Sequence, residues 1–419
     1  MRVEVPYGQT HITVDLDPDR IAGIIYPNEV ATHDESDVLT QALENPLGKP
    51  SFSEYMQEPG KTIVIVNDGT RPTPTSKVIS HLADYLVKGD SEFIIATGVH
   101  RAPTEDEYQL IFGEHYSTLA AENRIIVHDA NNDDDMTFIG TSKNGTEMWV
   151  NKRVLEASKI IIIGSVEPHY FAGYTGGRKS FLPGLASYKT ISMNHKYALD
   201  PRARSLQLRG NPVHEDMIDA IRVLENTSIF SIQIVLDRNR RIYAASAGDI
   251  FASMEAAIAS ANEVYAVNIN RKEDIVVSVA PFPMDVDLYQ SQKALDNGKL
   301  ALNDGGILII VSKCRSGIGP DTFYQLMSSC ESPEEVLSKI EQGYILGYHK
   351  AAKMVEVGLW AEIWAVTGLD PQIMRKIFIQ PYPSLQNALD KAFQIKGPAS
   401  KVLFLMEGSV TVPLLQQTD

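Results

Sequence analysis

Short apolar runs rich in β-branched residues recur along this chain and alternate with amphipathic stretches. They read TIVIV at 62–66, FIIAT at 93–97, RIIVHD at 124–129, KIIIIGS at 159–165, SIQIVLD at 231–237, DIVVSVA at 274–280, GILIIVS at 306–312 and KVLFLM at 401–406. Runs that are apolar at every position are typical of strands buried on both faces, as in parallel sheets. Their alternation with helical segments predicts an α/β fold with mainly parallel, doubly wound sheets.

The length of the chain predicts two domains joined by a hinge. Its 419 residues exceed the roughly 250–300 at which one hydrophobic core stops growing. Polar or Gly/Pro-rich seams occur at 268–274 (NINRKED) and at 395–401 (IKGPASK). If the last strand returns to the first sheet, residues 1–268 plus 400–419 form an N-terminal domain that carries the site. Residues 269–399 then form a C-terminal α/β domain that closes over it.

Composition excludes several classes of protein. The formal charge is −15, from 53 acidic and 38 basic side chains, which disfavours binding to nucleic acid or to an anionic membrane surface. Two cysteines do not support a disulfide framework or a Cys-rich metal site. The first residues alternate like a strand, without the pattern of a secretory signal, and no apolar run approaches the roughly 20 residues that span a bilayer. We expect a cytoplasmic protein.

Polar residues follow the strand at 62–66 in the sequence NDGTRPTPT. In doubly wound sheets, ligands bind beyond the carboxyl ends of the strands. Arg71 can make a bidentate contact with a carboxylate or phosphate, and Asp68 can orient a ring or bind a ribose hydroxyl. The structural alternative is an Asp-Gly turn followed by a helix N-cap at Thr73 or Thr75.

Two histidines also lie just past strands. His100 occurs in GVHR and His169 in EPHYFAG. A lone histidine is more often structural, but this placement is the one that general bases use. Two such rings can flank one substrate, one for each face.

The segment GYTGGRKS at 173–180 has the wrong glycine spacing for a phosphate-binding P-loop. Lys179 in this loop is a candidate nucleophile or covalent attachment point, provided that its amine is neutral. Repulsion from Arg178 favours the neutral amine. The alternative is a lysine that is solvated or pairs with phosphate.

Metal-binding signals are sparse. His195, in MNHKYALD, is by itself weak evidence for zinc. His128-Asp129 and the acidic run at 133–135 are better explained by a solvated acidic loop than by a hard-metal site.

Tyr289, Gln290 and Lys293 fall on one side of a helix if their segment is helical, where they can close over an anionic substrate. The alternative is an exposed helical face.

Together, the motifs NDGTRP, TGVHR, EPHYFAGYTGGRKSFLPG, MNH and LYQSQKA resemble those of the nickel-dependent lactate racemases and their 2-hydroxy acid racemase and epimerase relatives. The resemblance extends from about residue 60 to 300, and the long block from EPHYFAG to MNH is its specific part. It implies two hinged α/β domains, the first of which binds a cofactor.

The cofactor implied by the resemblance is a nickel-pincer nucleotide, a pyridinium mononucleotide whose thiocarbonyl groups hold nickel. By the same resemblance, Lys179 tethers this group, His195 completes the nickel site, and His100 and His169 are the paired acid/base residues. The implied reaction inverts C2 of a 2-hydroxy acid: hydride leaves to the cofactor, the planar keto acid rotates, and hydride returns to its other face.

The resemblance also assigns the remainder of the pocket. Arg71, Lys293 and Gln290 hold the substrate; Asp68, Thr70, Gly177, Tyr289 and Gln290 line the cofactor site. The implied partners are a small 2-hydroxy acid and cofactor-assembly proteins. The motifs do not identify which 2-hydroxy acid is the substrate or what the oligomeric state is. They also do not indicate whether Trp360 or Trp364 lines the pocket.

Two other functions remain open from the sequence. One is a 2-hydroxy acid dehydrogenase with diffusible NAD, which the missing GxGxxG turn disfavours. The other is a non-catalytic two-domain protein that binds a small anion, in which paired histidines would be superfluous.

Overall fold

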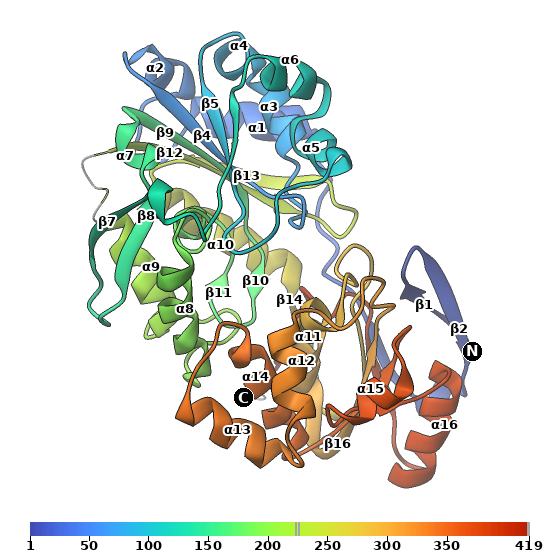
Figure 1. Cartoon of the computed structure of the whole chain (residues 1–419). Coiled ribbons are helices and arrows are strands. Elements are labelled where there is room, and N and C mark those ends of the chain that lie inside the picture. The colour runs from blue at the N-terminus through green and yellow to red at the C-terminus, as the bar shows by residue number, and fades with distance from the viewer. Residues whose placement is uncertain (223, 225–226, 417–419) are drawn as a thin grey trace. The chain divides into compact units, whose positions relative to one another are not determined.

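The computed structural model describes residues 1–222, 224 and 227–416. The chain divides into two compact units. Unit 1 comprises Met1–Asn28, Pro168–Tyr170 and Tyr265–Asp419, and unit 2 comprises Glu29–Glu167 and Phe171–Val264. Each unit contains a six-stranded sheet (Figure 1).

The sheet of unit 2 has the strand order β13-β12-β9-β4-β5-β6. Its strands are β4 (Thr62–Asn67), β5 (Glu92–Ala96), β6 (Ile125–Val127), β9 (Lys159–Ser165), β12 (Ser228–Leu236) and β13 (Ile242–Gly248). All neighbours pair in parallel except β13, which is antiparallel to β12. The five apolar runs expected as strands between residues 62 and 237 therefore all contribute to this sheet, whereas the run expected at 263–269 (EVYAVNI) is a strand only over Ala266–Ile269 and lies outside it.

Helices cover both faces of this sheet because its strands are apolar at successive positions. Val64 and Val66 face one core, and Ile63 and Ile65 face the other. The first core is covered by α1 (Glu35–Glu44), α2 (Phe52–Gln57), α3 (Thr75–His81), α4 (Ala83–Leu86), α5 (Glu105–Phe112) and α6 (Tyr116–Ala121), most of which gather on one side of the sheet in Figure 1. The second core includes residues of α7 (Arg153–Glu156), α9 (Pro212–Arg222) and α10 (Ile250–Tyr265). Unit 2 also contains α8 (Tyr188–Lys196) and the hairpin of β7 (Met136–Thr141) and β8 (Glu147–Asn151).

The sheet of unit 1 is parallel throughout, in the order β18-β17-β16-β15-β19-β3. Its strands are β3 (Ile21–Ile25), β15 (Glu273–Val279), β16 (Leu302–Val311), β17 (Glu362–Val366), β18 (Gln380–Pro381) and β19 (Val402–Leu405). A hairpin of β1 (Arg2–Tyr7) and β2 (Thr10–Asp15) packs with α16 (Leu385–Lys396) on one face. The unit also contains α11 (Leu288–Gly298), α12 (Asp321–Ser328), α13 (Pro333–Gln342), α14 (Tyr348–Gly358), α15 (Pro371–Arg375) and the parallel pair of β14 (Ala266–Ile269) and β20 (Val412–Leu415). The doubly wound α/β fold class predicted from the sequence is confirmed.

The last core strand lies in a different sheet from the one expected. β19 pairs with β15 and β3, so it belongs to unit 1 and does not return to the sheet of unit 2. The first 28 residues belong to unit 1 as well. The boundaries drawn from the sequence, 1–268 plus 400–419 against 269–399, therefore differ from this division. An apolar run fits between parallel strands of either sheet, so its sequence does not say which sheet it enters.

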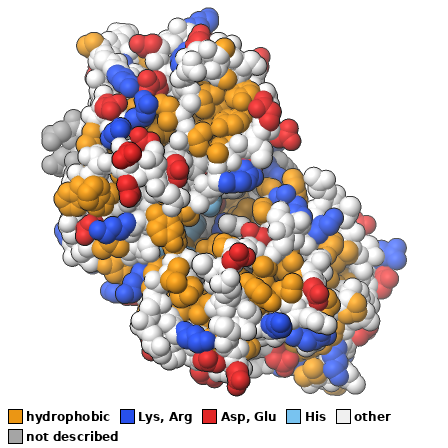
Figure 2. Space-filling view, in the orientation of Figure 1, with side chains coloured by type: hydrophobic (Ala, Val, Ile, Leu, Met, Phe, Trp, Pro, Cys, Tyr) orange, Lys and Arg blue, Asp and Glu red, His pale blue; other side chains and the backbone are white. Residues whose placement is uncertain are grey.

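On the face seen in Figure 2, acidic and basic side chains are interspersed with apolar ones. Among the described residues, no helix is both long and apolar enough to cross a membrane.

Candidate active site

The carboxylate of Asp68 and the ring of His100 form a hydrogen-bonded pair in unit 2. Asp68 directly follows β4, is only 6% exposed, and its Oδ2 lies 2.7 Å from His100 Nδ1. Its Oδ1 accepts hydrogen bonds from the Thr70 hydroxyl at 2.6 Å and the Thr70 backbone N–H at 3.1 Å. This contact is the one that the first of the two roles considered for Asp68, the orientation of a ring, requires.

The ionisation of Asp68 determines which nitrogen of His100 carries a proton. Burial alone raises the pKa of the Asp68 carboxyl, but the hydrogen bond and charge of His100, the charge of Arg71 and the bond from Thr70 lower it to about 2. An ionised carboxylate can only accept, so His100 Nδ1–H donates to it and Nε2 is the nitrogen that can take a further proton. A carboxylate placed behind an imidazole in this way orients and supports a general base.

Strand register places this pair. β4 and β5 are parallel, with Asn67 opposite Ala96, so Asp68 and Thr97 leave the sheet at the same level. Gly98 then adopts φ +56°, a conformation that a side chain disfavours, and His100 N–H donates to the Thr97 carbonyl to close the turn. The turn delivers the imidazole back toward the end of β4.

The helix-cap alternative for the NDGTRPTPT segment is wrong for both threonines. Helix α3 begins at Thr75 itself, with Pro74 in the N-cap position. The Thr73 hydroxyl lies 2.7 Å from Asn67 Nδ2 and 2.8 Å from the Ser165 hydroxyl. Thr73 therefore joins the ends of β4 and β9, which the sequence did not indicate because Ser165 is 92 residues away.

The glycine-rich loop is held by a buried glutamine. Gly177 N–H donates to Gln233 Oε1 at 2.9 Å, and a Cβ on Gly176 would lie 2.5 Å from the same oxygen. Gly177, which is expected to line the cofactor site, therefore has its backbone N–H bound within the protein. The sequence could not indicate this, because Gln233 lies on β12, 56 residues further on.

Arg178 is fully buried and fixes the same loop from within. Its guanidinium donates to the carbonyl oxygens of Ala172 at 2.7 Å and Tyr174 at 3.0 Å. Burial lowers the pKa of Arg178 to about 9. This side chain therefore shapes the segment that precedes Lys179.

Lys179 and His195 lie against one aromatic ring. Lys179 is 9% exposed, with Nζ 5.4 Å from the centre of the Phe171 ring, and the His195 ring centre lies 5.0 Å from that of Phe171. His195 is on α8, and its Nδ1 lies 3.1 Å from Asn194 Oδ1. If Nδ1–H donates to this amide oxygen, Nε2 is left with a lone pair that can bind a metal.

Backbone bonds connect the Lys179 segment to the His100 turn. Gly184 N–H donates to the Lys179 carbonyl at 2.9 Å, and the Gly184 carbonyl accepts from Gly98 N–H at 3.0 Å. The backbone of Gly184 therefore connects the loop that carries Lys179 to the turn that carries His100.

His169 belongs to unit 1. It is 6% exposed, and its ring stacks on that of Tyr170 with 5.0 Å between centres. The Nζ of Lys350 lies 5.2 Å from the centre of the Tyr170 ring and 4.1 Å from that of Tyr289. Lys350 therefore lies between the His169 segment and the start of α11.

Tyr289, Gln290 and Lys293 share a partly exposed face of α11, as their spacing predicted. The neighbouring helical positions Leu288, Ser291 and Gln292 are buried. Asp287 caps the helix by accepting from Gln290 N–H at 2.6 Å. Unit 1 thus contains His169, Tyr289, Gln290 and Lys293, whereas Asp68, Thr70, Arg71, His100, Gly177, Lys179 and His195 are in unit 2.

Sequence reasoning missed Lys350, which is 4% exposed on α14. A signal was present, since HKAAK places cations in a helix that is otherwise apolar enough to be buried. It was not recognised because lysines are rarely buried.

Other candidates are structural. His128 is buried, with Nε2 3.0 Å from the Ala186 carbonyl, and burial lowers its pKa. Trp364 is part of the core of unit 1. Within residues 1–222, 224 and 227–416, no three His, Cys, Asp or Glu side chains are grouped to hold a metal ion.

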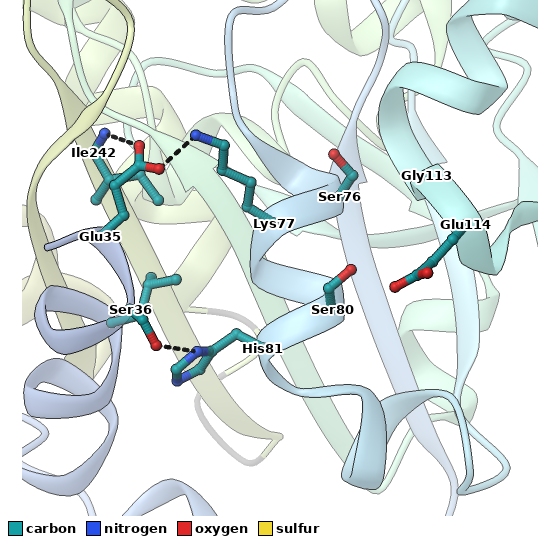
Figure 3. A pocket seen from close by; sticks show the side chains of 10 residues that line it. Glu35, Ser36, Ser76, Lys77, Ser80, His81, Gly113, Glu114 and Ile242 are labelled. Carbon is teal, nitrogen blue, oxygen red and sulfur yellow. Dashed lines mark hydrogen bonds and ion pairs between the residues drawn. The ribbon is translucent and has the colours of Figure 1, made fainter.

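A cavity of about 480 Å³ lies elsewhere in unit 2, and Figure 3 shows it between α1, α3 and the segment at Gly113. Its polar groups bind one another: Glu35 accepts from Lys77 at 2.6 Å and from Ile242 N–H at 2.7 Å. The ring of His81 contacts the hydroxyls of Ser36 and Thr40. Within the part of the chain that the structure describes, none of the candidate site residues discussed above lines this cavity. We therefore interpret the cavity as a seam between helices.

Comparisons with known proteins agree with this architecture. The lactate racemase N-terminal domain profile matches residues 7–205, and the C-terminal domain profile matches residues 267–412. The lactate racemases of Thermoanaerobacterium thermosaccharolyticum and Lactiplantibacillus plantarum are 31% and 28% identical to this chain, over 97% of its length and 97% and 98% of theirs. The structure of the T. thermosaccharolyticum lactate racemase apoprotein aligns with a TM-score of 0.88 at 31% identity, covering 99% of this chain and 100% of that one.

The fold and these relatives define a two-unit α/β isomerase of the racemase class. The chain belongs to the lactate racemase family.

The lowered pKa of Asp68 predicts how stability depends on pH. A depressed pKa stabilises the fold above the unfolded value near 4, and that contribution is lost as pH falls toward about 2. Asp68→Asn should therefore be less stable than the parent chain by about 2 kcal/mol at pH 6, with the gap closing at acid pH. Urea unfolding between pH 6 and pH 3 measures it, with the exposed Asp134→Asn as a matched control. A gap that stays constant with pH would contradict the assignment.

Proposed function

We propose that this chain inverts C2 of a lactate-like 2-hydroxy acid, using a nickel-pincer nucleotide tethered to Lys179. One observation above all supports the proposal: an ionised Asp68 holds His100 so that Nε2 can accept a proton, in a turn bonded to the segment that carries Lys179. Membership in the lactate racemase family supports the same reaction.

The side chains around Lys179 fit a tethered metal-bearing ring. The lysine Nζ and the His195 ring contact the same Phe171 ring, so a planar group attached to the lysine has an imidazole within its surroundings. Asn194 orients that imidazole, as the second ligand sphere of metal-binding histidines commonly does. When bound, the cofactor would supply an acceptor that takes the C2 hydrogen with its electron pair and returns it.

The two histidines would handle the hydroxyl proton. The C2–H of a 2-hydroxy acid is too weakly acidic for an imidazole to remove as a proton, whereas its hydroxyl proton is within reach of a positioned base. His100 Nε2 would take that proton from one isomer, and the carboxylate of Asp68 would stabilise the imidazolium. His169 would take the same part toward the opposite isomer.

The remaining site residues would hold the acid while its keto form rotates. Arg71 and Lys293 supply cations for the substrate carboxylate, and Gln290 supplies an amide. Thr70, Gly177 and Tyr289 would line the cofactor pocket, with Gly177 contributing surface because its N–H is bound to Gln233. Proteins that assemble the cofactor are the implied partners.

The lysine tether can be tested directly. The chain is produced in a host that makes the cofactor, and intact mass, nickel content and loss of optical rotation of a panel of 2-hydroxy acids are measured. The parent should carry an adduct and racemise at least one acid; Lys179→Ala should carry none and be inactive, because it lacks the attachment amine. Lys189→Ala, at an exposed surface ion pair, is the control. A loaded parent that inverts no acid on the panel would sink the proposed reaction.

The acid/base assignment predicts a loss in both directions. His100→Ala should reduce racemisation of each isomer by about 10²- to 10⁴-fold, since the ring is a base one way and an acid the other. Its measured adduct and nickel content should remain those of the parent. His81→Ala, which removes a histidine of the same unit at the helix seam, should retain activity. Normal rates for His100→Ala would remove it from the pair.

A further inference from the structure

Lys350 is a cation buried inside unit 1. It lies on α14, which packs against α11, α12 and α13, and only 4% of it is exposed. Burying an ammonium group is costly unless polar or aromatic groups replace its water. The groups that contact the ammonium therefore indicate the role of this lysine.

Three of these groups belong to the candidate site or its immediate neighbours. The ammonium donates to the backbone carbonyl of Tyr289 and lies 4.1 Å from the centre of the Tyr289 ring. On another side it lies 5.2 Å from the centre of the Tyr170 ring, which stacks on the ring of His169. Both distances are within the range of cation–π attraction.

The bond to Tyr289 bears on the helical turn that carries the substrate anchors. In an α-helix, the carbonyl of Tyr289 is the acceptor for the N–H of Lys293, four residues later. A group that holds this oxygen holds the first turn of α11, from which Gln290 and Lys293 project. The contact with Tyr170 holds the peptide next to His169.

We propose that Lys350 is a positioning residue of the racemase site. By binding Tyr289 and Tyr170 at once, it fixes the substrate-anchoring face of α11 relative to the acid/base residue His169. Displacement of a reacting group by about 1 Å can cost about 100-fold in rate, so loss of this clamp should slow turnover without removing any group that touches substrate.

Hydrogen exchange of the purified chain tests the clamp without needing the reaction. Lys350→Met keeps the length of the side chain and removes its charge and donor. The backbone amides of 169–172 and of the first turns of α11 should then exchange faster together. The matched control is Lys299→Met, which removes a lysine bound to Asp296 at the opposite end of α11. Lys350→Arg should restore protection, since a guanidinium also binds carbonyl oxygens and aromatic faces.

Kinetics provide the second arm, which rests on the proposed function. Loaded Lys350→Met should lose about 10- to 100-fold in kcat in both directions, with a smaller change in KM, and Lys350→Arg should recover most of it. Unchanged exchange in either segment, or altered exchange with parental kinetics in an active enzyme, would overturn the inference. If Lys350→Met shows faster exchange in both segments but the loaded parent inverts no 2-hydroxy acid, the result would count against the proposed function alone.

Discussion

The parallel register of β4, β5 and β9 is the constraint on which the unit 2 site depends. Val66 is opposite both Ile95 and Ile163, so the three strands end at the same edge of the sheet. The chain leaves that edge three times, toward Asp68, toward His100 and toward the glycine-rich loop. A shift of register would separate the carboxylate from the ring that it orients. The chemistry is therefore positioned by backbone pairing, and the loops supply only the last turn.

Buried charges set the internal geometry of both units, because each requires groups that replace water. In unit 2, the Asp68 carboxylate accepts hydrogen bonds from His100 and Thr70, and the Arg178 guanidinium donates to the backbone carbonyl oxygens of Ala172 and Tyr174. In unit 1, the Lys350 ammonium is satisfied by a carbonyl and two aromatic rings. In each case, the side chain that carries the charge fixes the backbone next to a proposed catalytic or substrate-binding group.

The sequence predicts those features that depend on neighbouring residues in the chain. The apolar runs identified the strands, and the residues directly after them included the pair of Asp68 and His100. What the sequence left out depends on partners distant in the chain. The segment 67–75 leaves a helix cap at Thr73 open because it does not reveal the partner Ser165, and the glycine-rich loop does not reveal that Gly177 N–H binds Gln233 on another strand. The final strand, 402–405, was placed in the other sheet because an apolar strand does not encode its neighbours.

The central claim is that the hydrogen on C2 never enters water during inversion. Deuterium incorporation at C2 during racemisation in D₂O tests this most directly, with the loaded enzyme and a single isomer of its acid. The account predicts that the inverted product retains protium at C2, while its hydroxyl exchanges freely. Product that carries deuterium at C2 in proportion to the inversion would instead require proton abstraction at carbon, and would contradict the account.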